Sequence, residues 1–117
     1  MEQQPCILSE TVSFNITFGL PLDENRLSEV VRVCQLDEDL KSFPDGLDTK
    51  IGQMGVTISG GQRARISLAR ACYSDADIFL LDDPLSSVDL SVAQKIFTEC
   101  IRGFLREKAI VLVTHRL

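Results

Sequence analysis

The sequence lacks several features that would assign the protein to a familiar class. It has no run of about 20 apolar residues, the length that a helix needs to cross a bilayer, so we expect no membrane span within it. Met1 is followed by Glu-Gln-Gln-Pro, which is not a signal peptide. Basic residues are outnumbered, 12 against 17 acids for a net charge of -5, and this disfavours a nucleic-acid surface.

Closely spaced cysteines are also missing. The four cysteines are Cys6, Cys34, Cys72 and Cys100, and no two have a metal-ligand spacing such as C-x-x-C. Because no secretory segment accompanies them, we expect reduced, packed thiols of a cytosolic protein.

The chain has enough apolar residues for one core. Its 117 residues, 44% of them hydrophobic, suit a single small domain, and they contain no internal repeat or flexible linker. Residues 7–19 are mixed and predict no clear element. Asp23 is placed to cap a helix over residues 24–36, and a short helix is expected over residues 37–42. A loop rich in glycine then leads into a strong helical pattern over residues 60–73.

After residue 77 the apolar period changes. The run from Ile78 to Leu81 is continuously apolar and ends in Asp82-Asp83-Pro84, which predicts a parallel strand buried on both faces. A helix is expected over residues 91–106, and a second buried strand over residues 109–113. The inner stripe of that helix is predicted to be Ile96, Phe97, Cys100, Ile101 and Phe104. Strand, helix and strand in this order predict a right-handed crossover, so the fold class is α/β, with a helical segment before a βαβ unit of a parallel sheet.

Ser59-Gly60-Gly61-Gln62 opens the central helix. Ser59 is placed as the N-cap, and Gln62 completes a capping box. The N–H groups of the two glycines would face outward at the positive end of the helix dipole, where phosphate binds. An ordinary capped helix has the same pattern, so the motif alone does not establish a ligand site.

Polar residues follow both predicted strands. Asp82 and Asp83 end the first strand, and His115, the only histidine, follows the second. Ligands of parallel sheets bind beyond the carboxyl ends of the strands, where one carboxylate could hold Mg²⁺ through water and its neighbour could act as a general base. A solvated strand end would also explain isolated aspartates, and a lone histidine is more often structural than catalytic.

In combination these motifs resemble the nucleotide-binding domain of ABC transporters. The signature motif, Walker B, D-loop and H-loop match residues 57–65, 80–84, 86–89 and 113–115 in turn, and residues 3–9 look like the Q-loop. The resemblance covers essentially the whole chain and is greatest to the first such domain of the C subfamily, the multidrug-resistance-associated proteins. It implies a partial P-loop NTPase-like fold, with a helical, signature-bearing part over about residues 20–75 and a core over about residues 76–117.

The resemblance also implies partners, ligands and roles. ATP and Mg²⁺ would be the ligands, and the partners would be a second nucleotide-binding domain and transmembrane domains at the cytoplasmic face of a membrane, with no nucleic acid. The signature residues would contact ATP held by the partner domain, and Asp89 would communicate across the dimer. At this domain's own ATP, the resemblance assigns metal contact to Asp82 and Gln3, and catalysis to Asp83, His115 and Gln3. The signature residues that would contact the partner's ATP are Ser59, Gly60, Gly61 and Gln62.

Two departures limit what the chain would do alone. Asp83 stands where the family has its catalytic glutamate, and its shorter side chain implies slow hydrolysis at this site. None of the seven glycines is followed by lysine, so the phosphate-binding G-x-x-x-x-G-K-[ST] loop is absent. We therefore expect a fragment or truncated product of an exporter's motor domain, inactive by itself.

Two other functions remain open. One is a non-catalytic module that donates its signature helix in trans to another ATP-binding subunit. The other is a soluble ABC ATPase that acts on ribosomes or DNA, which the acidic charge disfavours.

Overall fold

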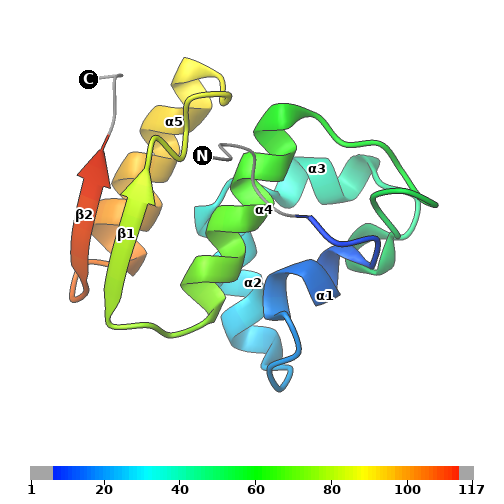
Figure 1. Cartoon of the computed structure of the whole chain (residues 1–117), viewed down its shortest axis with the longest axis horizontal. Helices are drawn as coiled ribbons and strands as arrows, with labels where there is room; N and C mark the ends of the chain where they lie inside the picture. The colour runs from blue at the N-terminus through cyan, green and yellow to red at the C-terminus, as the bar shows by residue number, and fades with distance from the viewer. Residues whose placement is uncertain (1–6, 114–117) are drawn as a thin grey trace.

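The protein is described by a computed structural model over residues 7–113. Five helical segments come first, and a strand–helix–strand unit follows (Figure 1). The chain's α/β class is as the sequence predicts. Gln3 and His115 lie outside the described residues.

The helical part is organised around one long central helix. Its elements are α1 (Val12–Thr17), α2 (Glu24–Val33), α3 (Asp37–Ser42), the 3-10 turn η1 (Gly46–Asp48) and α4 (Gly60–Tyr73). The sequence predicts α2, α3 and α4 within a few residues, but it does not predict α1. Helix α1 is short, and it is held by the fully buried Asn15, whose side-chain amide exchanges hydrogen bonds with the backbone of Leu8 on the loop before it.

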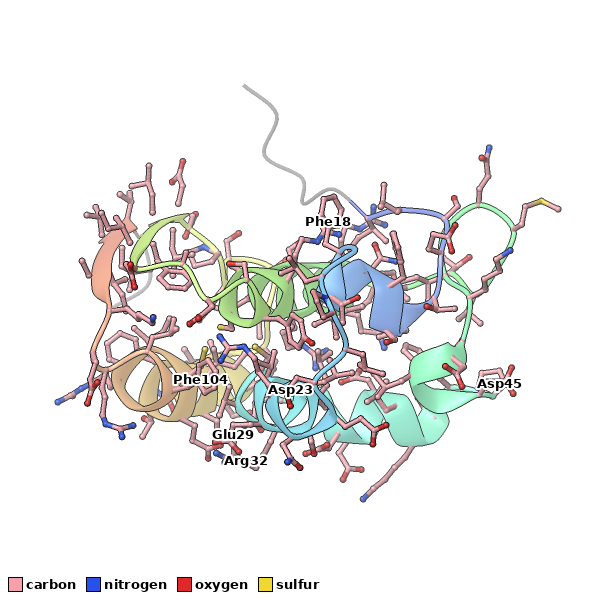
Figure 2. All side chains as sticks on the ribbon, turned by 90° about the horizontal axis from the view of Figure 1, so that it is seen from below. Phe18, Asp23, Glu29, Arg32, Asp45 and Phe104 are labelled. Carbon is pink, nitrogen blue, oxygen red and sulfur yellow. The ribbon has the colours of Figure 1, made fainter. Side chains whose placement is uncertain are left out.

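The second part contains a two-stranded parallel sheet. Strand β1 (Ile78–Asp82) pairs with β2 (Ala109–Val113), with Ile78 opposite Ala109 and Asp82 opposite Val113. The connection runs through α5 (Leu90–Ile96) and η2 (Phe97–Phe104), which lie on one side of the two strands (Figures 1 and 2). The βαβ unit is therefore confirmed.

Two predictions about this unit are wrong. The first is burial of the strands on both faces: Phe79 and Leu81 are buried, but Ile78 and Leu80 are 72% and 76% exposed. Val111 and Val113 of β2 are also exposed. Within residues 7–113 helices cover only one face of the sheet, so alternate residues of each strand meet solvent.

The second concerns the inner stripe of the helix after β1. The helix expected over residues 91–106 is present as α5 followed by η2, but η2 is a π-helix, in which Leu105 N donates to Cys100 O at 2.9 Å. The wider i→i+5 turn changes the direction of successive side chains. Ile96, Cys100 and Ile101 are buried as expected, whereas Phe97 of the predicted inner stripe is 40% exposed.

Candidate functional site

The start of α4 is a capped helix end that presents two glycines. The Ser59 hydroxyl oxygen accepts a hydrogen bond from Gln62 N at 3.1 Å, and the Gln62 side-chain oxygen accepts one from Ser59 N at 2.8 Å. The predicted capping box is therefore present. Gly60 and Gly61 take the first two helical positions, whose N–H groups have no acceptor within the helix. Such N–H groups, at the positive end of the dipole, are suited to bind phosphate.

Gln62 is held by its neighbours in the fold. Its side-chain nitrogen donates to Asp39 of α3 at 2.9 Å. Arg65 donates to the other oxygen of Asp39 at 2.5 Å and to Gln35 O at 2.6 Å. Burial raises the pKa of Asp39, but the hydrogen bonds from Arg65 and Gln62 outweigh it, so the pKa lies below its usual value. The charged pair fixes the first turn of α4 against α3.

An open groove lies between the start of α4 and the loop that follows β1. It has a volume of about 510 Å³. Its lining residues are Ser59, Gly60, Gly61, Arg65, Ser87, Val88, Asp89 and Val92. The structure thus brings the first three predicted signature residues together with Asp89, 28 or more positions away in the sequence.

The two walls of the groove are in direct contact. Ser87 Oγ donates to Gly60 O at 3.2 Å. A Cβ atom on Gly61 would lie 3.1 Å from Ser87 O, closer than side chains normally pack, so the approach requires glycine at that position. Asp89 caps α5 by accepting hydrogen bonds from Ser91 N and Ser91 Oγ at 3.3 and 2.7 Å. Asp89 therefore has a structural role in addition to its place in the groove.

The two aspartates after β1 have different environments. Asp82 ends the strand with an exposed side chain on the same face as Ile78 and Leu80. Asp83 has a left-handed backbone, with φ of 49°, and its N–H donates to Val113 O at 2.6 Å. One Asp83 carboxylate oxygen is buried with no hydrogen-bond partner among residues 7–113. A buried acceptor without a partner is costly, and at the carboxyl edge of a sheet it is consistent with a missing ligand or proton donor.

The predicted residues therefore fall into two places. Ser59, Gly60, Gly61 and Asp89 line the groove, whereas Asp82 and Asp83 lie at the strand end and do not line it. Gln62 adjoins the groove and orders it through Asp39.

Some residues in the groove or next to it were not identified from the sequence. Arg65 lies in the signature segment and Ser87 in the D-loop segment. Their roles became visible only from the contacts of Arg65 with Asp39 and of Ser87 with Gly60. Asp39 had no distinguishing signal, because an acid on a short acidic helix usually faces solvent.

Known proteins match this chain closely. The sequence profile of the ABC transporter family matches residues 1–86. The chain is 52% identical over 114 residues to "Probable multidrug resistance-associated protein lethal(2)03659" of Drosophila melanogaster, covering 97% of this chain and 8% of that protein. It is 50% identical over 117 residues to human "ATP-binding cassette sub-family C member 4", covering 100% of this chain and 9% of that protein.

A third relative is the "Multidrug resistance protein" of Leishmania tarentolae, 52% identical over 118 residues, with 98% of this chain and 7% of that protein covered. The chain thus spans less than a tenth of the length of these relatives. No helix within residues 7–113 is long and apolar enough to cross a bilayer. From the profile, the identities and the order of its motifs, this chain belongs to the ABC transporter family and is similar to the C-subfamily, multidrug-resistance-associated members.

Proposed function

We propose that this chain is part of the ATP-driven motor of an ABC exporter and that its groove contacts ATP held by a partner nucleotide-binding domain. The observation that carries the proposal is the start of α4, where Gly60 and Gly61 present N–H groups beside the Ser59 hydroxyl. These donors suit the γ-phosphate of a nucleotide carried by another surface. The signature-bearing part would comprise about residues 20–75, and the core would comprise about residues 76–117.

The strand end would serve a different ATP. Asp82 places an exposed carboxyl group at the carboxyl edge, which fits a metal contact through water. Bound Mg²⁺ would neutralise phosphate charge there. One oxygen of Asp83 has no hydrogen-bond partner within residues 7–113 and would accept a proton from an attacking water in the assembled site. Gln3 and His115 would complete this site as metal and phosphate contacts. The separation of the strand end from the groove supports two ATP molecules served by one domain.

A chimera tests the role of the groove. The chain would replace its matching segment in human ATP-binding cassette sub-family C member 4, and ATPase activity would be measured in membranes. Ser59→Arg should reduce turnover roughly 100-fold, as loss of a phosphate donor does, because the guanidinium would fill the groove. Ser74→Arg, the same change at the other end of α4, is the control. Equal activity of the two variants would refute the assignment.

The alternative of a non-catalytic module acting in trans predicts a different result. We expect the separate 117-residue chain to show no turnover of Mg-ATP. If it nevertheless activates a partner that carries an intact phosphate-binding loop when added as a second protein, the module function is favoured. Transport and membrane attachment would in either case belong to the assembled protein.

A further inference from the structure

Three cysteines far apart in the sequence meet in the core. Cys34 ends α2, Cys72 lies in the last turn of α4 and Cys100 lies in η2. Their sulfur atoms all lie within 4.8 Å of one another, and those of Cys72 and Cys100 are 3.4 Å apart. All three are free thiols with at most 1% exposure. Aliphatic side chains alone could fill this part of the core, so three thiols that meet at one point are unusual packing.

The local backbone distinguishes this cluster from ordinary packing. Cys100 lies in the π-helix, a rare conformation that is frequent at functional sites. Cys34 and Cys72 lie at the C-terminal ends of α2 and α4, where the helix dipoles are negative. Negative helix ends oppose a free thiolate and favour a cation beside it.

A positively charged side chain lies beside the backbone of Cys72. Arg26 donates to Cys72 O at 2.9 Å and to Tyr73 O at 3.2 Å, and its guanidinium lies over the rings of Tyr73 and Phe104 (Phe104 is labelled in Figure 2). Negative charge on the sulfurs of a loaded site would therefore have a cation close by.

We propose that Cys34, Cys72 and Cys100 bind one soft monovalent metal ion, Cu(I), as three thiolate ligands. With metal–sulfur bonds of about 2.3 Å, sulfurs in a flat three-coordinate site would lie about 4 Å apart, which the cluster nearly matches. Structural zinc takes four ligands, and residues 7–113 place no fourth histidine, cysteine or carboxylate in this group. Thiolates select soft ions such as Cu(I). Each sulfur releases its proton to solvent as its bond to the metal forms.

A bound ion would join the two parts of the protein. Helices α2 and α4 belong to the helical part, whereas η2 belongs to the βαβ unit, and the three lie side by side (Figure 2). Three bonds to one ion would cross-link segments 28 or more residues apart. Because the ion binds only the folded arrangement, it should stabilise the protein. This inference does not depend on the proposed motor function.

Anaerobic titration of the reduced 117-residue chain with Cu(I), supplied as its acetonitrile complex against a coloured Cu(I) chelator, tests the site. Wild-type protein should bind one equivalent and melt at a higher temperature once loaded. Cys34→Ala, Cys72→Ala and Cys100→Ala should each weaken binding by at least about 100-fold, the upper range for losing a residue that only supports a ligand, and should remove the thermal shift. Because the sulfurs are buried, each titration point must reach equilibrium.

Two controls separate coordination from packing. Cys6→Ala removes the remaining cysteine and should bind Cu(I) as wild type does. Val30→Ala empties a fully buried position of α2, so it should lower the melting temperature but keep Cu(I) binding. The proposal is overturned if Cu(I) stays with the chelator, if the three cysteine variants bind as wild type does, or if air produces a Cys72–Cys100 disulfide while the anaerobic protein takes up no ion.

Discussion

The hydroxyl of Ser87 donates a hydrogen bond to the carbonyl oxygen of Gly60 across 3.2 Å, joining the loop after β1 to the first turn of α4. This contact links two motifs that are separated by 27 positions in the chain. The groove is therefore formed by both the helical part and the βαβ unit. The geometry of the proposed phosphate contact therefore depends on packing at this junction.

Adjacent glycines at this junction should respond differently to alanine. On Gly61 a Cβ atom would lie 3.1 Å from the Ser87 backbone oxygen, whereas on Gly60 its nearest neighbour, Ser87 Cβ, is at 3.6 Å. Gly61→Ala should therefore be about 1 kcal/mol less stable than Gly60→Ala, since overpacking opposes the helical preference that both variants gain. Chemical denaturation of the two proteins measures the difference. Equal stabilities of the two variants would show that the loop carrying Ser87 moves to accommodate the added methyl group at no cost.

Asp39→Asn should destabilise the protein. The side chains of Asp39 and Arg65 are only 15% and 12% exposed, so the substitution leaves a buried guanidinium without its counter-charge. We expect a loss of about 2 kcal/mol at pH 7, less than for complete removal of a buried partner because asparagine still accepts a hydrogen bond. Glu38→Gln, at the adjacent exposed pair with Lys41, should change little.

The same pair predicts a dependence on pH. The folded pKa of Asp39 is lowered, so its contribution is complete above the unfolded value of about 3.9 and is lost as the pH falls through the folded pKa. The stability of Asp39→Asn relative to wild type should therefore recover below about pH 4. Unfolding curves at several pH values measure this. A constant difference down to pH 2 would contradict the assigned shift.

Neighbouring leucines of β1 should differ in their tolerance of a polar residue. Leu80 is 76% exposed and Leu81 is 9% exposed. In the 117-residue chain Leu81→Ser should cost about 3 kcal/mol, whereas Leu80→Ser should remain within about 0.5 kcal/mol of wild type. If the open face is covered in an assembled transporter, Leu80→Ser should lower stability only in the chimera. Equal losses in the isolated chain would mean that both faces are buried.

Asp83→Glu tests the weakened general base. Glutamate extends the carboxylate by one methylene towards an attacking water, so turnover at this site should rise where a phosphate-binding loop is present. The gain would be measured in the chimera as single-site ATP hydrolysis, with Asp83→Asn as the inactive control. Because Asp83 has φ of 49°, glutamate should also cost a little stability. Unchanged turnover would show that another residue limits this site.

The elements of this protein could be predicted largely from local pattern. Asp23, Ser59 and the apolar period locate α2 and α4, because caps and periodicity act over a few residues. The two strands follow from their apolar runs. Helix α1 escaped prediction because it depends on Asn15, whose partners include the distant Arg70.

The sequence by itself determined the family, the order of the motifs and the type of each element, since these depend on residues near one another in the chain. Only the tertiary structure decided which face of β1 is covered, that Asp39 pairs with Arg65, and that Ser87 closes on Gly60. It alone brought Cys34, Cys72 and Cys100 together. The spacing of residues along the chain does not predict such long-range contacts, because they arise from the packing of helices against one another and against the sheet.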